Sequence, residues 1–302
     1  MCESILRITE LVSPVLTAAL SSCLDMLCEI RLRADKPIVV YLLNSPYYVN
    51  PDGVLETICS ENMLSVSFRQ LQTLFAALCE YSVYKHIENA ANGFITFSGG
   101  HRIGVCGSAV TDGGKVVSVC DITSLNIRAA KQITGCADVV FQNADIARGV
   151  LICGAPSSGK TTILRDMART LSLDKIKKVA VVDERLEIAS YCGGKCGFDV
   201  GLSDVYSGYP KSVAVMLAVR TMSPDFMICD ELTGDDCKAV SMCFNCGVPM
   251  IAAVHCDSLL AAKRNRTVSE LMSTGAFSSV VFLDGSIPAN ISSVVDYERY
   301  FE

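Results

Sequence analysis

The second half of the chain alternates short apolar runs with stretches of helical periodicity. The runs are GVLICG, KVAVVD, DFMICD, PMIAAVH and VVFLDG, and all of them follow residue 136. Continuous apolar strands of this kind are buried on both faces, as in a parallel sheet that is covered by helices. We therefore expect an α/β domain over residues 136–302, with a parallel sheet that is covered by helices.

The first part of the chain shows a different pattern. Residues 29–49 alternate and are rich in Val, Ile and Tyr, which predicts two strands around Pro37. Residues 68–88 predict a helix, because apolar positions recur at helical spacing. Two hairpins follow, with turns at 98–100 and 112–114. These elements predict a smaller α+β domain over residues 1–135, with the boundary between 131 and 144.

Composition and charge narrow the classes of function. The 302 residues suit one large or two moderate domains, and with 50% apolar and 19% charged residues they indicate extensive burial or subunit interfaces. A net charge of -6 argues against electrostatic binding to a nucleic acid backbone. The N-terminus does not have the pattern of a secretory signal, and no run reaches the roughly 18 apolar residues that span a bilayer. We expect a cytoplasmic protein.

The chain contains 16 cysteines, most of them inside apolar runs. In a long chain without an export signal, reduced buried thiols are the favoured interpretation. Two close pairs, Cys192 with Cys196 and Cys243 with Cys246, leave a zinc site as an alternative, since four thiolates could close a tetrahedral site.

Residues 154–161, GAPSSGKT, match the phosphate-binding pattern G-x-x-x-x-G-K-[ST] between a predicted strand and a predicted helix. Backbone N–H groups of such a loop surround the phosphates, Lys160 reaches the β and γ phosphates, and the hydroxyl of Thr161 faces Mg²⁺. The sequence therefore predicts a site for ATP with Mg²⁺. Its nucleotide-binding residues are Gly154, Ala155, Pro156, Ser157, Ser158, Gly159, Lys160, Thr161 and Thr162.

Acidic residues end two of the predicted strands. Asp230 and Glu231 follow the run FMIC, so Asp230 is expected to hold Mg²⁺ through water and Glu231 to orient or deprotonate the attacking water. Asp183 and Glu184 end the run VAVV and add a second candidate metal carboxylate in Asp183, with a solvated strand end as the alternative. His255 closes a further strand, where it could touch the γ-phosphate or be structural.

The order of these motifs resembles that of the ATPases that power bacterial secretion and type IV pili. Besides the phosphate loop, the resemblance covers four motifs. They are the acidic motif after VAVV, the segment before the run FMIC, that run with the two acidic residues that follow it, and the histidine at the end of the run PMIAAV. The resemblance implies a RecA-like P-loop NTPase fold for residues 136–302. It also implies functional roles for Glu184 and Arg220 beside those of Lys160, Glu231 and His255. The matching residues are Asp183, Glu184 and Glu187; Arg220, Pro224 and Asp225; Asp230 and Glu231; and His255.

A longer resemblance covers nearly the whole chain. The segments EIRLRADKPI, GGHRIGVCGSAV, ITSLNIRAAKQITGCAD, GAPSSGKTTILRD, VAVVDER and RTMSPDFMICDE are similar to the stage III sporulation protein AA family. The resemblance implies an ATPase that powers or assembles the channel between mother cell and forespore. It also implies a homo-oligomeric, hexameric ring at the cytoplasmic face of a complex of membrane proteins.

In such a ring, a neighbouring subunit could complete each site with an arginine that stabilises the charge of the transferred phosphoryl group. The candidates are Arg102, Arg128 and Arg220, for which ordinary solvent exposure is the alternative. Two other functions stay open. One is a RecA-like nucleic acid translocase, and the other is a nucleotide-gated scaffold with little turnover.

Overall fold

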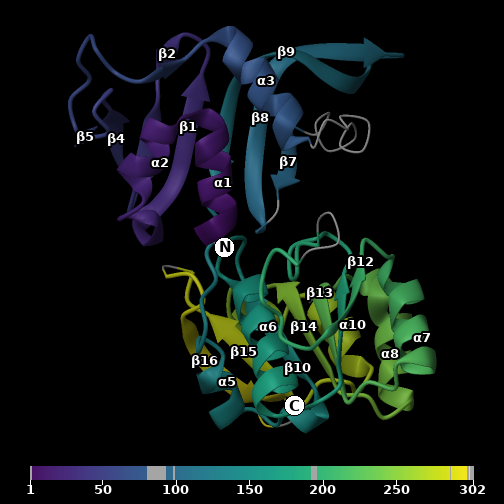
Figure 1. Ribbon diagram of the computed structural model, residues 1–302. Coiled ribbons are helices and arrows are strands. Elements are labelled where there is room, and N and C mark those ends of the chain that lie inside the picture. The colour runs from purple at the N-terminus through teal and green to yellow at the C-terminus, as the bar shows by residue number, and fades with distance from the viewer. Residues whose placement is uncertain are drawn as a thin grey trace. The chain divides into compact units, whose positions relative to one another are not determined.

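The computed structural model describes residues 2–79, 93–97, 99–191, 196–285, 287–297 and 299. The chain divides into two compact units, Met1–Lys131 with Cys192–Gly197 and Gln132–Tyr191 with Phe198–Glu302. Figure 1 shows that each unit is built on its own sheet, and each has its own hydrophobic core.

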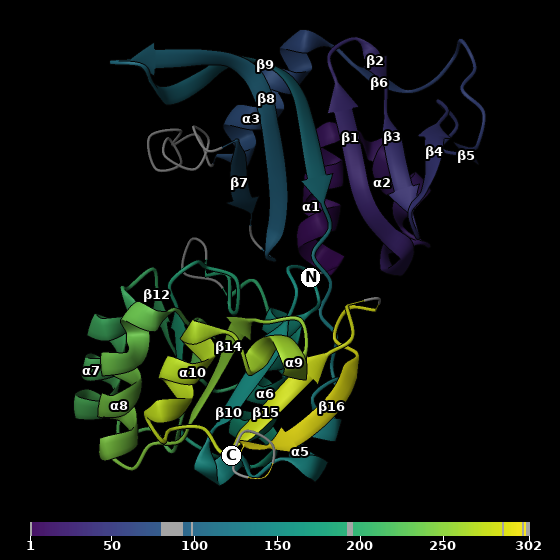
Figure 2. The ribbon, with the colours of Figure 1, turned by 180° about the vertical axis from the view of Figure 1, so that it is seen from behind.

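The first unit is an antiparallel seven-stranded sheet with the strand order β5-β4-β3-β1-β9-β8-β7. Helices α1, α2 and α3 pack on one face, and among the described residues no helix covers the other face (Figures 1 and 2). The elements are α1 (Cys2–Val12), α2 (Pro14–Leu20), η1 (Leu24–Met26), β1 (Leu27–Arg33), β2 (Lys36–Pro37), β3 (Val39–Leu42), β4 (Ser45–Val49), β5 (Leu55–Glu56), β6 (Ser65–Val66), α3 (Phe68–Leu78), β7 (Phe94–Phe97), β8 (His101–Asp112) and β9 (Lys115–Arg128).

The region around Pro37 contains more strands than the two that the sequence predicts. After β1 the chain forms the short β2, which pairs with β6, and then the hairpin of β3 and β4. The hairpin turn places Leu43 and Asn44 at φ values of 47° and 70°. Asn tolerates this conformation but Leu rarely adopts it. The residue types at this turn are therefore not ones from which a hairpin would be predicted.

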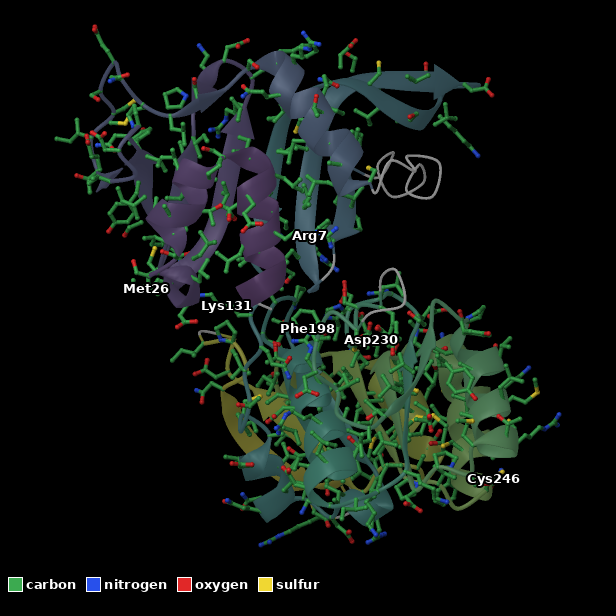
Figure 3. All side chains as sticks on the ribbon, viewed as in Figure 1. Arg7, Met26, Lys131, Phe198, Asp230 and Cys246 are labelled. Carbon is green, nitrogen blue, oxygen red and sulfur yellow. The ribbon has the colours of Figure 1, made fainter. Side chains whose placement is uncertain are left out.

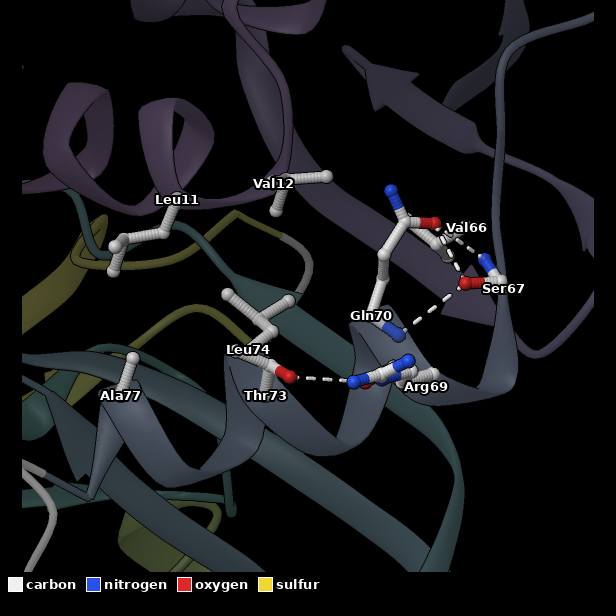
Figure 4. A pocket seen from close by; sticks show the side chains of 9 residues that line it. All are labelled: Leu11, Val12, Val66, Ser67, Arg69, Gln70, Thr73, Leu74 and Ala77. Atoms are coloured by element: carbon white, nitrogen blue, oxygen red, sulfur yellow. Dashed lines mark hydrogen bonds between the residues drawn. The ribbon is translucent and has the colours of Figure 1, made fainter.

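Helix α3 confirms the apolar part of the predicted helix, and residues 80–88 of that prediction lie outside the described residues. Ser67 begins the helix with a capping box, in which its hydroxyl accepts from the N–H of Gln70 and the Gln70 side chain accepts from the N–H of Ser67. Figure 4 shows these bonds beside a hollow of about 320 Å³ that lies between α3 and Leu11 and Val12 of α1.

Both predicted hairpins are present. β7 and β8 pair antiparallel, with Phe97 opposite His101, although Ser98 in the connection lies outside the described residues. β8 and β9 turn at Gly113 and Gly114, whose positive φ values suit a tight turn.

The second unit is a sheet with the order β12-β11-β13-β14-β10-β15-β16, parallel except for β16. Helices α5 and α6 cover one face, and α7, α8, α9 and α10 cover the other (Figures 1 and 2). This confirms the predicted α/β layers. The elements are α5 (Asp138–Asn143), η3 (Ile146–Arg148), β10 (Val150–Gly154), α6 (Lys160–Arg169), η4 (Thr170–Asp174), β11 (Val179–Asp183), β12 (Asp204–Ser207), α7 (Lys211–Thr221), β13 (Phe226–Glu231), η5 (Gly234–Asp236), α8 (Cys237–Asn245), β14 (Met250–His255), α9 (Leu259–Ala262), α10 (Arg266–Ser273), β15 (Ser279–Leu283) and β16 (Ile291–Asp296).

The cysteine pairs that raised the zinc alternative are only partly described. Cys192 lies outside the described residues, while Cys243 is buried and Cys246 is exposed. Within the described ranges, no group of three or more His, Cys, Asp or Glu side chains is placed to hold a metal ion. In the same ranges, no helix combines the length and the apolar character that a membrane span requires.

Candidate active site

The phosphate loop connects the inner strand β10, which lies between β14 and β15, to helix α6. Ser157 and Gly159 have positive φ values of 63° and 97°. A Cβ atom on Gly159 would lie 2.2 Å from the backbone nitrogen of Ala289, so only glycine fits at this position. Gly159 is also the N-cap of α6, and it has no side chain that could cap the helix. The N–H groups of the first turn are therefore available to an anion.

Lys160 begins α6 and is only 7% exposed. Its ammonium group donates to the carbonyls of Gly154 and Ala155, each at 2.8 Å, and lies 3.1 Å from Nδ1 of His255. The three contacts match the three protons of an ammonium group. Burial lowers the pKa of Lys160, while the negative charge of Glu231 is the strongest influence in the opposite direction.

His255 connects Lys160 to Glu231. Because an ammonium group can only donate, Nδ1 of His255 accepts, and the ring proton of the neutral imidazole is then on Nε2. That nitrogen lies 2.7 Å from Oε1 of Glu231. The strand order explains the contact, since β14 lies between β10 and β13 and its end reaches both neighbours.

The other carboxylate oxygen of Glu231 pairs with an arginine. Nη1 of Arg185 lies 2.8 Å from Oε2. The side chain of Glu231 is 17% exposed, whereas that of Arg185 is 52% exposed. The predicted base is therefore in contact with a donor on each of its oxygens.

Asp230 lies at the end of β13, and Figure 3 labels it at the edge of this unit's sheet. It is 3% exposed, and its Oδ2 atom is buried with no hydrogen-bond partner among the described residues. Burial, together with the negative charges of Glu187 and Asp183, raises the pKa of Asp230 to about 6. An unpaired buried carboxylate oxygen is costly, and a bound cation would compensate it.

Asp183, which the sequence predicts as a metal ligand, accepts backbone hydrogen bonds with both of its carboxylate oxygens. Oδ1 accepts from the N–H groups of Glu187 and Ile188, and Oδ2 accepts from those of Ala189 and Ser190, at 2.7 to 3.1 Å. Four donors occupy the four lone-pair positions of a carboxylate. The fully buried Asp183 therefore organises the loop over residues 187–190.

We expect Asp183→Asn to destabilise the second unit by about 2–5 kcal/mol, because the amide leaves two buried N–H donors without acceptors. Urea unfolding measures the effect, with the exposed Asp174→Asn as control. If Asp183→Asn unfolded like the wild-type chain but lost its dependence on Mg²⁺, Asp183 would be a metal ligand after all.

Three other predicted residues, Glu184, Asp225 and Arg220, form no hydrogen bond or ion pair with the phosphate loop within the described ranges. Glu184 pairs with the buried Lys211 at the start of α7, with 2.6 Å between Oε2 and Nζ. Asp225 accepts from the N–H of Lys178, where β11 and β13 begin. Arg220 is exposed and lies in the last turn of α7, just before β13 begins. It is therefore at the end of the strands opposite to the end that carries Asp230.

Arg102 and Arg128 are direct cross-strand neighbours in the first unit. Both are exposed, and the guanidinium group of Arg102 lies 5.5 Å from the ring centre of Phe94. Their register places them on the same face of the sheet, which the sequence alone did not indicate.

The sequence missed three residues of this site. Arg185 was part of the acidic motif without a role, and only its contact with Glu231 reveals one. Arg165 of α6 donates to the carbonyls of Glu187 and Ile188, so it supports the loop that Asp183 also holds. Ala289 donates its N–H to the carbonyl of Ser158 in the phosphate loop. The two residues are far apart in the sequence, so no local sequence pattern predicts this contact.

Comparisons with solved structures identify the fold. The structure is similar to the ATPase DotB of Legionella pneumophila, with a TM-score of 0.55, 13% identity, and coverage of 89% of this chain and 74% of DotB. DotB of Yersinia pseudotuberculosis gives a TM-score of 0.54, 15% identity, and coverage of 88% and 73%. The second unit therefore has the RecA-like P-loop ATPase fold.

The family follows from the sequence comparisons. A family model described as "Sporulation stage III, protein AA" matches residues 3–299. Stage III sporulation protein AA of Bacillus subtilis (strain 168) is 32% identical over 279 residues, which are 89% of this chain and 86% of the relative. The chain belongs to the sporulation stage III protein AA family.

Proposed function

We propose that this chain is an ATP-hydrolysing motor that powers or assembles the channel between mother cell and forespore. The observation that carries the proposal is the phosphate loop of β10 and α6, with Gly159 at a position that only glycine fits and Lys160 at the first helical position. The secretion-ATPase fold and the membership in a sporulation family support it.

The residues at the loop fit a nucleotide with Mg²⁺. The N–H groups of the first turn of α6 would bind the phosphates, together with Lys160. Thr161 and the unpaired oxygen of Asp230 would hold Mg²⁺, in part through water. When bound, Mg²⁺ supplies positive charge that neutralises the phosphate oxygens. The residues Gly154 to Thr162 line this loop and its helical turn.

Glu231 is the proposed base that orients or deprotonates the attacking water, because it follows Asp230 directly at the carboxyl end of β13 and contacts His255 beside the phosphate loop. His255 contacts both Lys160 and Glu231, so it links the phosphate end of the site to this base. We assign Asp183 and Glu184 to the support of the surrounding loops, since their carboxylates are engaged by backbone donors and by Lys211.

We further propose a ring, in which the first domain contacts neighbouring copies and membrane proteins at the cytoplasmic face. A neighbour would supply an arginine to each site. Among the three candidates, the adjacent and exposed Arg102 and Arg128 are favoured over Arg220. Because they are directly opposite each other on one face of the sheet, both guanidinium groups would approach the same phosphoryl group.

The proposal predicts that the chain assembles when it binds nucleotide. Light scattering should show a larger particle with Mg-ATP than without nucleotide, and phosphate release should accompany it. Arg102→Ala with Arg128→Ala should lower phosphate release, while Lys177→Ala, an exposed substitution in the second unit, should leave it unchanged. A monomer under all nucleotide conditions would contradict the ring, and nucleotide binding without any phosphate release would favour a scaffold.

A further inference from the structure

The carboxylate of Glu231 is restrained from two sides. His255 contacts Oε1 at 2.7 Å and Arg185 contacts Oε2 at 2.8 Å. A general base must place a free lone pair within hydrogen-bond reach of the proton that it removes. Any rotation of the Glu231 carboxylate out of this orientation breaks at least one of these two contacts.

Arg185 is well placed to act as a releasable restraint. It follows β11 at the carboxyl edge of the sheet, where ligands of α/β proteins bind. Its side chain is 52% exposed and uses a single nitrogen for the contact with Glu231. A guanidinium group prefers to bind phosphate or carboxylate with two parallel donors, so a phosphate group offers Arg185 a stronger partner.

His255, which contacts Glu231, also contacts Lys160 next to the phosphate loop. Lys160 donates to Gly154, Ala155 and His255, so all of its donors are engaged within the chain. Phosphate oxygens at the loop would compete for this ammonium group, and the contact with His255 would be lost. His255 would then hold Glu231 less firmly.

We propose that Arg185 is a positioning residue that restrains Glu231 until a nucleotide phosphate draws Arg185 and Lys160 away. The inference rests on the proposed function, because it presumes that Glu231 acts on water at a bound nucleotide. It assigns to Arg185 the suppression of turnover in the unassembled chain. The ion pair contributes little to folding, since the half-exposed Arg185 side chain is screened by water.

The test compares phosphate release by the unassembled full-length chain and its variants at saturating Mg-ATP. Arg185→Ala should raise kcat about two- to fivefold with little change in KM, because the restraint has the strength of a partly exposed ion pair. Arg185→Lys, which keeps the charge, should stay near the wild-type rate. Arg169→Ala removes a similar pair, with Asp199 at 3.1 Å, and should have no effect.

A second comparison shows whether the effect passes through the base. In a Glu231→Gln background, Arg185→Ala should give no increase in kcat. An Arg185→Ala rate equal to or below the wild-type rate, or an equal increase in both backgrounds, would overturn the restraint. If the wild-type chain failed to bind Mg-ATP at all, the proposed function itself would fail, and this result is distinct from either of those.

Discussion

Replacing Lys160 by alanine should abolish measurable ATP hydrolysis, with a loss of about 10²–10³-fold or more, as expected for a group that stabilises charge on the transferred phosphate. The buried ammonium group is the side-chain cation in contact with the loop carbonyls of Gly154 and Ala155. Its removal leaves the phosphates with backbone donors alone. Phosphate release at saturating Mg-ATP measures the effect.

The comparison needs a control for folding, because Lys160→Ala also removes donors from two carbonyls and from His255. Circular dichroism and thermal unfolding should show a folded variant, and the exposed Lys177→Ala should hydrolyse ATP at the wild-type rate. A folded Lys160→Ala chain with normal turnover would refute the assignment of this loop as the phosphate site.

Replacing Glu231 by glutamine should stop turnover and leave ATP bound. The amide has nearly the same shape and can still accept from His255 Nε2, but it cannot take a proton from water. Loss of a general base lowers kcat by about 10²–10⁴-fold. Gel filtration followed by nucleotide analysis should recover unhydrolysed ATP with the protein.

Glu270→Gln is a matched control, because Glu270 also pairs with an arginine of the same unit, at 2.7 Å from Arg266. This variant should hydrolyse ATP normally. Normal hydrolysis by Glu231→Gln, on the other hand, would remove Glu231 from the role of base and, with it, the restraint that we assign to Arg185.

Sequence patterns predicted the second unit well because its strands are buried on both faces. The run Val179 to Val182, for example, is apolar throughout and is followed by Asp183 at the ligand edge. The first unit was harder. The hairpin of β3 and β4 turns at Leu43 and Asn44, and the two N-terminal helices α1 and α2 were not predicted, since they are stabilised by packing on a sheet that forms later in the chain.

The candidate site divides in the same way. Local spacing identified the phosphate loop, Asp230, Glu231 and His255, which the strand order then brings to one edge of the sheet. It could not distinguish a carboxylate that faces a ligand from one that accepts four backbone N–H groups, as Asp183 does. That distinction depends on how the loop after β11 folds back onto Asp183, and the order of residue types does not predict the path of this loop.

The central claim is that the loop between β10 and α6 binds a nucleotide triphosphate with Mg²⁺. Titration of the purified full-length chain with Mg-ATP in a calorimeter tests it most directly, with Lys160→Ala measured alongside. The account predicts saturable binding at one site per chain and a clear loss of affinity in the variant. A folded wild-type chain that bound neither Mg-ATP nor any other Mg-nucleotide would contradict it.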